Sequence, residues 1–206
     1  MKPSLVHVAW PLLAVTLAGC AGAKGPPTQF YVLSPLNAPT TSGTQRAALV
    51  VDVAAVDLPE YLDRPQIVTR TGTNRLEMAD DHQWGGNLRK DMARILAENI
   101  SRLLGGEVTA GTQPAPLARV EMEVMRFERM PEGRVTLAAN WSISLGRDRR
   151  RVAARFTELE SDPVPADDYT GIAAAMSDLL GRLSQTLADE VRAQAKGHSS
   201  TQPSAR

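Results

Sequence analysis

The chain has 206 residues, with 23 Lys and Arg against 23 Asp and Glu, three His and one Cys. The balanced charge excludes the basic surface of a general nucleic-acid binder, and a single Cys excludes a disulfide framework and a Cys-based zinc site. Aromatic residues make up 4% of the chain, which argues against stacking on bases or sugars, whereas 43% hydrophobic and 22% charged residues are typical of a globular domain.

The chain begins with a positively charged segment containing Lys2, followed by an apolar run that ends at Cys20. This run is shorter than the roughly 20 residues that cross a membrane, so residues 1–19 are predicted to be a secretory signal peptide. Leu17-Ala18-Gly19-Cys20 resembles a bacterial lipobox, in which the signal is cut before the Cys and lipid is attached to its thiol. The resemblance implies a covalent lipid on Cys20, and no other cofactor is expected.

The residues after Cys20 bear on location and domain limits. Ala21 and Gly22 include no Asp, which by resemblance to enterobacterial sorting signals implies the outer membrane, with the protein facing the periplasm. Residues 20–29 are rich in Gly and Pro and are predicted to tether the lipid to a folded domain over residues 30–196. Residues 197–206 are small and polar, which predicts a disordered tail.

Strand-forming residues predominate in the first half of the domain. They predict strands at residues 30–33, 47–56, 66–70 and 75–79, with a hairpin between the last two because residues 71–74 have turn chemistry. From Trp84 to Leu104 the apolar residues recur with helical spacing, and Gly105-Gly106 ends this predicted helix.

The second half alternates apolar and polar residues in three consecutive segments. These segments predict a meander of strands at residues 119–129, 134–145 and 151–160, with the alternation slipping near Met125. A second amphipathic helix is predicted at about 168–195. The element order predicts an α+β two-layer sandwich, a mostly antiparallel sheet with two long amphipathic helices on one face. Free strand edges make a second copy of the chain a candidate partner, as in a homo-oligomer.

Motifs of enzymes are absent from the sequence. It has no H-E-x-x-H, no G-x-S-x-G and no Gly-rich phosphate loop, so we expect no catalytic residue and no metal site. Asp80-Asp81-His82 could contribute to a metal site or supply a base, but we interpret it as a polar connector at a helix N-terminus. A periplasmic hydrolase is therefore the least favoured alternative. The Arg-rich run at 147–151 could bind a lipid phosphate or an acidic partner, but is more typical of a solvated hairpin turn.

An unusual segment joins the second and third predicted strands. It reads Leu58-Pro59-Glu60-Tyr61-Leu62-Asp63-Arg64-Pro65. Its prolines favour extended backbone, Asp63 can cap local amides, and Arg64 can pair with Asp63 or Glu60 or contact a partner. From the residues alone, a structural connection and a partner-binding loop are both compatible with this pattern.

This segment also carries a family resemblance. The run Leu58–Val68, with Phe30-Tyr31-Val32-Leu33 before it and Trp84 after it, resembles the PqiC/YmbA family of ABC-type transport auxiliary lipoproteins. The resemblance covers about residues 30–191. It implies a non-enzymatic lipoprotein on the periplasmic face of the outer membrane that docks an MCE-domain protein of an inter-membrane lipid transporter and supports envelope integrity.

Four residues of the segment are the predicted partner-binding residues on this basis. They are Leu58, Tyr61, Asp63 and Arg64, with Tyr61 and Arg64 as the main contacts because Tyr and Arg dominate interface hot spots. The alternative function is a carrier lipoprotein that holds an acyl chain between the sheet and the helices.

Overall fold

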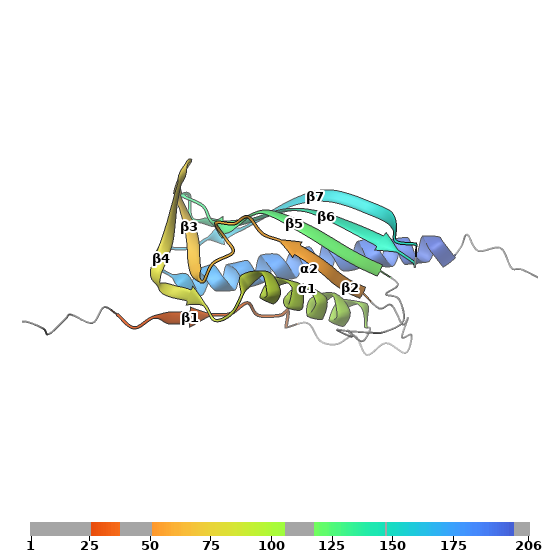
Figure 1. Cartoon of the computed structure of the whole chain (residues 1–206), viewed down its shortest axis with the longest axis horizontal. Helices are drawn as coiled ribbons and strands as arrows, with labels where there is room; N and C mark the ends of the chain where they lie inside the picture. The colour runs from red at the N-terminus through yellow and green to blue at the C-terminus, as the bar shows by residue number, and fades with distance from the viewer. Residues whose placement is uncertain (1–25, 38–50, 106–117, 147, 200–206) are drawn as a thin grey trace, which may run out of the picture.

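Seven strands and two helices make up the part of the chain that the computed structural model describes, which is residues 26–37, 51–105, 118–146 and 148–199. Figure 1 shows most of the sheet lying over both helices, which run along the long axis of the domain, while the first strand passes beneath them. In chain order the elements are β1 (Gln29–Tyr31), β2 (Val51–Asp57), β3 (Gln66–Gly72), β4 (Arg75–Trp84), α1 (Leu88–Leu104), β5 (Ala118–Arg129), β6 (Arg134–Leu145), β7 (Arg150–Pro163) and α2 (Tyr169–Ser199).

The strands form one mixed sheet in the order β1-β4-β3-β5-β6-β7, and β2 also pairs with β5. Among the described strands, β3–β4, β5–β6 and β6–β7 are antiparallel, while β1–β4, β2–β5 and β3–β5 are parallel. The α+β class is confirmed, and the expectation of a mostly antiparallel sheet fits in part: the longest ladders, β5–β6 and β6–β7, are antiparallel, but the sheet is mixed because three of the six pairings are parallel. The reason is that β2 and β3 follow the same edge of β5 in the same direction, so the segment between them does not reverse the chain.

The meander of β5, β6 and β7 matches the predicted strands closely. The register of β5 against β6 shifts between Val124 and Arg126, which is a β-bulge at the position where the alternation slips near Met125. Inward residues of β6 such as Leu137 and Ile143 are buried, whereas Asn140 on the opposite face is exposed. One face of this part of the sheet therefore packs on the helices and the other faces solvent.

Both predicted helices are present, each with a capped N-terminus. The Asn87 side chain accepts a hydrogen bond from Lys90 N at 3.1 Å, and Gly105 ends α1 in the left-handed region with φ 68°. Asp168 Oδ1 accepts from Gly171 N at 2.8 Å at the start of α2. The predicted apolar stripes lie in the core, whose helical members include Leu88, Met92, Ile95, Leu96, Ile100, Ile172, Met176, Leu179, Leu180, Leu183, Leu187 and Val191.

Residues 80–84 differ from the prediction. Asp80-Asp81-His82 was expected in a polar connector and helical spacing was expected from Trp84, but β4 continues to Trp84 and α1 begins at Leu88. The reason lies in β1, which pairs in parallel with the end of β4, with Gln29 opposite His82. A partner so distant in sequence cannot be detected from local spacing.

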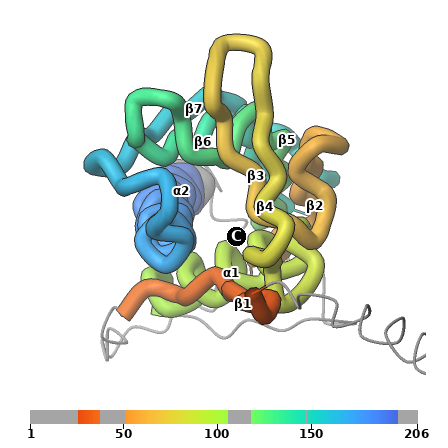
Figure 2. Tube along the Cα trace, turned by 90° about the vertical axis from the view of Figure 1, so that its left-hand side faces the viewer, coloured from red at the N-terminus to blue at the C-terminus, as the bar shows by residue number. Residues whose placement is uncertain are grey.

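The space between the sheet and the helices is filled by side chains. Figure 2, an end-on view, shows the sheet curving around α1 and α2. Met92 and Ile95 of α1, Phe127 of β5 and Leu183 of α2 each have no exposed surface. An acyl chain lying between sheet and helices would have to displace such residues, so the packing does not favour the carrier alternative.

Candidate docking site

The segment Leu58–Pro65, called the connector below, lies beside β5 between β2 and β3. It forms a tight turn in which Leu62 N donates to Pro59 O at 2.9 Å and Arg64 N donates to Leu62 O at 2.9 Å. Its end is fixed because Trp84 N donates to Pro65 O at 2.7 Å. The connector is thus an ordered loop that leaves β2 and returns the chain, as β3, to the same edge of β5.

Two leucines attach the connector to the core. Leu58 is buried, and Leu62 has only 2% of its surface exposed. Their spacing of four residues places both side chains on the inner side of the turn. Leu58, one of the four predicted partner-binding residues, therefore packs against the protein itself.

Tyr61 belongs to a polar cluster around a buried carboxylate. Its hydroxyl donates to Glu128 Oε2 at 3.0 Å, and Glu128 has no exposed surface. Arg70 contacts Glu128 Oε1 from the other side, with Nε at 3.1 Å and Nη2 at 2.9 Å. Phe127 N donates to Glu128 Oε2 at 2.9 Å. The buried charge is therefore matched by a cation and two further donors, as burial of a carboxylate requires.

The electrostatics of this cluster affect Tyr61 and Arg70. Burial, together with the nearby Glu128 carboxylate, raises the pKa of Tyr61 to about 12. The hydrogen bond to Glu128 raises the pKa of the Arg70 guanidinium above its usual value. Both groups therefore keep their protons at neutral pH, which is the state that the hydrogen bonds require.

Asp63 joins the connector to the start of α1. Its carboxylate accepts from Arg89 Nη2 at 2.8 Å and from Asn87 Nδ2 at 3.2 Å. Asn87 is also the N-cap of α1, so the carboxylate lies where the helix dipole favours negative charge. The expectation that Asp63 caps local amides is thus replaced by a side-chain contact to a helix N-terminus.

Arg64 contacts neither of the carboxylates suggested from the sequence. Its Nη1 lies 3.0 Å from Met78 Sδ of β4, and no ion pair of Arg64 is found in the described ranges. Its Nε is buried and has no hydrogen-bond partner among the described atoms. Of the four predicted residues, Arg64 is the one with an unsatisfied polar group.

The four residues therefore lie in one turn, but their side chains point to different places. Leu58 faces the core, Tyr61 reaches Glu128, Asp63 reaches α1 and Arg64 reaches β4. Their partner-binding role stays a prediction. Glu128, which sequence reasoning did not single out, holds Tyr61 in place.

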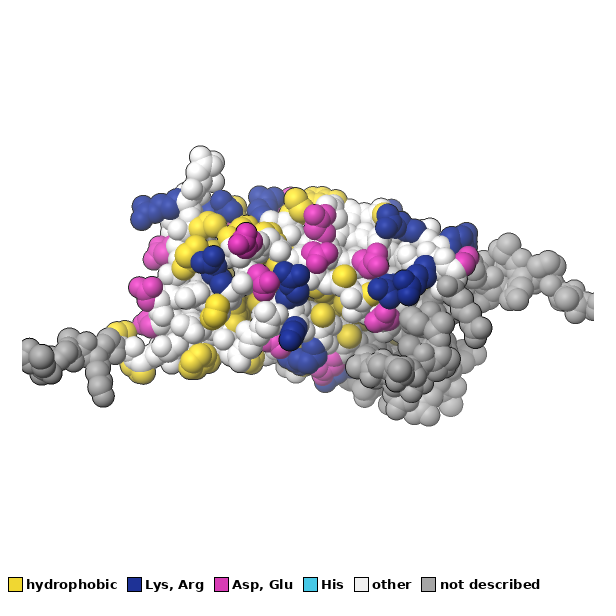
Figure 3. All heavy atoms as spheres, viewed as in Figure 1, with side chains coloured by type: hydrophobic (Ala, Val, Ile, Leu, Met, Phe, Trp, Pro, Cys, Tyr) yellow, Lys and Arg dark blue, Asp and Glu magenta, His cyan; other side chains and the backbone are white. Residues whose placement is uncertain are grey.

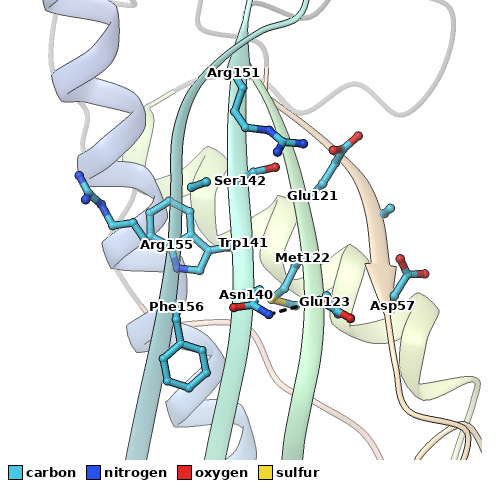
Figure 4. A pocket seen from close by; sticks show the side chains of 12 residues that line it. Asp57, Glu121, Met122, Glu123, Asn140, Trp141, Ser142, Arg151, Arg155 and Phe156 are labelled. Carbon is cyan, nitrogen blue, oxygen red and sulfur yellow. Dashed lines mark hydrogen bonds between the residues drawn. The ribbon is translucent and has the colours of Figure 1, made fainter.

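Apart from the connector, a concave surface lies on the solvent face of the sheet. It is a groove of about 640 Å³ with a floor that includes the small residues Ala55, Ser142 and Ala154. Figure 4 shows Phe156 of β7 on one side of the groove and acidic residues of β5 and β2 on the other, with the Arg151 side chain of β7 pointing toward Glu121. Sequence reasoning missed this groove, although small and polar residues in the outward positions of β6 and β7 were the available signal.

The acidic side of the groove consists of Asp57, Glu121 and Glu123. Asn140 Nδ2 donates to Glu123 Oε2 at 3.2 Å and Arg119 Nε donates to Glu121 Oε1 at 3.2 Å, so these carboxylates are held in place. Phe156, which also lines the groove, has 56% of its surface exposed, so a partner seated there could bury its ring. The groove lining also includes Arg151 and Arg155, so the groove offers a partner an exposed apolar side chain between charged groups of both signs.

His82 stacks on Tyr169 with ring centroids 3.9 Å apart, and its Nδ1 lies 2.8 Å from Tyr31 Oη. In the described parts of the chain, no group of three His, Cys, Asp or Glu side chains is arranged to hold a metal. In the Arg-rich run, Arg149 takes φ 52° in the turn before β7. Cys20 and Arg147 lie outside the described residues.

Comparison with known proteins gives the family. A model of the family "ABC-type transport auxiliary lipoprotein component" matches residues 31–188. The chain is similar to the intermembrane transport lipoprotein PqiC of Escherichia coli K12, with 27% identity over 146 residues, which is 70% of this chain and 75% of PqiC. PqiC of Shigella flexneri matches equally.

Solved structures share the fold. The protein XCC0632 of Xanthomonas campestris superposes with a TM-score of 0.69 at 19% identity, covering 84% of this chain and all of the other. A further uncharacterised protein superposes with a TM-score of 0.68 at 18% identity, covering 81% of this chain and 99% of the other. Since the family model spans most of the folded domain, including the connector, the chain belongs to the family of ABC-type transport auxiliary lipoprotein components.

Proposed function

We propose that this protein is a lipid-anchored docking subunit of an MCE-type inter-membrane lipid transporter, held at the outer membrane and facing the periplasm. Its role is to hold a partner protein at the membrane, and it catalyses no reaction. Acyl chains on Cys20 hold the domain at one membrane, and the domain binds the MCE-domain protein there. Tethering raises the effective concentration of the partner at that membrane.

The lipobox supports the anchoring part of the proposal. Cys20 is the only Cys of the chain and follows Leu17-Ala18-Gly19 directly. More than one acyl chain is needed for durable attachment, because a single chain binds membranes weakly. Neither described helix is long and apolar enough to span a bilayer.

The observation that carries the docking part is the open groove on the sheet, which continues into the connector. Asp57 lines the groove and directly precedes Leu58. Tyr61 Oη lies 3.5 Å from the carbonyl oxygen of Met125, whose exposed side chain belongs to the same strand as Glu121 and Glu123. A partner seated in the groove would therefore also reach the connector.

Affinity purification of the intact lipoprotein from membranes tests this function. We expect an MCE-domain protein to co-purify with the wild type, and its recovery to fall several-fold for Phe156→Asp. The matched control is Gln185→Asp, which places the same charge at an exposed position of α2 that lines neither the groove nor β1. Equal recovery with Phe156→Asp and wild type would contradict docking in the groove, and an unmodified Cys20 thiol by intact-mass measurement would contradict the anchoring.

A further inference from the structure

Apolar side chains are exposed in and directly after β1, the first strand of the domain. Phe30 has 67% of its surface exposed and Val32 has 60%. The intervening Tyr31 is partly buried and Leu33 is buried, so alternate side chains face the body and the solvent. Two large apolar side chains on one face of a short segment are thus left without cover among the described residues.

Several hydrogen bonds fix the position of the segment that carries Phe30 and Val32. Tyr31 O accepts from Gly85 N at 2.7 Å, and Tyr31 Oη lies 2.8 Å from His82 Nδ1. Further along, Ser34 N donates to Ser177 Oγ of α2 at 3.1 Å and Leu36 N donates to the buried Asn99 Oδ1 of α1 at 2.8 Å. Exposure of Phe30 and Val32 is therefore a property of an anchored segment and not of a loose terminus.

A shallow groove lies beside these residues, between β1 and the first turns of α2. Its volume is about 580 Å³, and its lining includes Phe30, Val32, Ala173 and Ala174. β1 is one of the edge strands of the sheet. Figure 3 shows hydrophobic side chains at the end of the domain where the chain preceding β1 leaves it. The apolar surface, called the β1 patch below, consists of Phe30, Val32, Ala173 and Ala174.

The length of the preceding chain limits how far the β1 patch can lie from a bilayer that holds Cys20. Phe30 is ten positions after Cys20, so even a fully extended chain places its Cα within about 35 Å of the Cα of the lipidated residue. Resting on the lipidation proposed above, we infer that the β1 patch contacts the bilayer surface and inserts Phe30 and Val32 among the lipids. The contact fixes which end of the domain faces the membrane, and thereby orients the groove on the sheet.

The charges around the patch indicate which lipid chemistry it uses. Asp80 and Asp81 lie in β4 beside His82, which is opposite Gln29 of β1. These carboxylates would repel anionic headgroups, so the contact depends on burial of apolar side chains into a zwitterionic surface. We therefore expect it to withstand high salt, which weakens attraction between exposed charges.

A single-thiol fluorescence experiment tests the inference. Because acylation consumes the thiol of Cys20, the variants Phe30→Cys and Val32→Cys each carry one free thiol for an environment-sensitive NBD label. The full lipoprotein is reconstituted in phosphatidylethanolamine–phosphatidylcholine vesicles with or without doxyl-labelled lipid. Phe156→Cys is the matched control, since Phe156 is a similarly exposed Phe on the opposite side of the domain core, on the solvent face of the sheet.

We expect the labels at residues 30 and 32 to shift to shorter emission wavelength in vesicles and to be quenched several-fold by doxyl lipid, with no such change at residue 156. If residues 30 and 32 stay as water-exposed as residue 156 while the protein floats with the vesicles, the bilayer contact is overturned and the anchoring stands. A blue shift that depends on protein concentration and occurs in detergent without vesicles would also overturn it, because a second copy would then cover the patch. If the wild type itself takes up the label, Cys20 is not acylated and the proposed anchoring fails with it.

Discussion

The connector and the groove on the sheet lie side by side but use their side chains in opposite ways. The connector has the more distinctive sequence, yet Leu58, Tyr61 and Asp63 all make contacts within the protein. The groove has an inconspicuous sequence of Ala, Ser and Asn between charged residues, yet it leaves Phe156 exposed. A distinctive run of residues can thus reflect the demands of the fold, while a binding surface can be built from ordinary strand positions.

Residues around the connector should contribute to the free energy of unfolding, whereas residues on the groove should contribute to partner recovery with little effect on stability. The following substitutions separate the two regions, beginning with the largest expected effect.

Glu128→Ala should destabilise the protein most, by about 3–5 kcal/mol, because it leaves the Arg70 guanidinium near the core without its counter-charge. Urea unfolding followed by circular dichroism measures the change. Glu123→Ala on the same strand is the matched control, and should change stability by only about 0.5 kcal/mol since Glu123 is exposed. Equal losses in the two variants would show that the buried cluster has no special role.

Tyr61→Phe should cost about 1–3 kcal/mol, because it removes the hydroxyl donor and leaves a buried carboxylate oxygen with one partner fewer. The same substitution in the Glu128→Ala background should have little further effect, since the two residues act through one hydrogen bond. Additive losses in a double-mutant cycle of unfolding free energies would contradict this account of Tyr61.

High pH should weaken the connector through Tyr61. Its pKa is about 12 in the folded protein against 10.0 for an ordinary tyrosine, so folding favours the protonated hydroxyl. The resulting stabilisation is fully present below pH 10 and is lost as the pH rises from 10 to about 12. The difference in unfolding free energy between wild type and Tyr61→Phe should shrink across this range, and a constant difference would argue against the raised pKa.

Asp63→Ala should have a smaller effect, of about 0.5–1 kcal/mol, because its ion pair with Arg89 is partly exposed to solvent. Thermal unfolding at low and high salt measures it, and the loss should be smaller at high salt. Arg89→Ala is the partner control and should lower stability by a similar amount. A loss as large as that of Glu128→Ala would mean that the start of α1 depends on the connector more than these contacts indicate.

Phe156→Ala should change stability least, by about 0.5 kcal/mol or less, because the side chain is largely exposed. Its recovery of the MCE-domain partner should nevertheless fall, as for Phe156→Asp but less strongly. Loss of partner with Tyr61→Phe at unchanged stability, and no loss with Phe156→Ala, would reverse the roles assigned to connector and groove.

Local patterning predicted a large part of this fold. The meander of β5 to β7, the bulge near Met125 and the apolar stripes of both helices follow from periodicity, since these elements contact their neighbours in sequence or bury one continuous face. The parallel pairings of β1 with β4 and of β2 with β5 were not predictable in the same way. They join segments far apart in the chain, and nothing in either segment alone identifies its partner.

The polar cluster shows a second limit of sequence reasoning. Glu128 lies in an alternating strand where an acidic residue normally faces solvent, and it is buried only because Tyr61 and Arg70 reach it from other segments. The connector motif was found from the sequence, but the direction of each side chain was not. Those directions depend on which strands lie beside the connector, and hence on the long-range pairings.

The parallel pairing of β2 with β5 has a consequence for how the chain acquires its structure. Val51 pairs with Ala118, so β2 has no place in the sheet until a much later part of the chain has formed a strand. The β5–β6–β7 meander, by contrast, closes through short turns and can form early. A chain that emerges from a secretion channel N-terminus first would accordingly keep β2 unpaired, and open to chaperones, until β5 had followed, whereas β3 can pair with β4 beforehand.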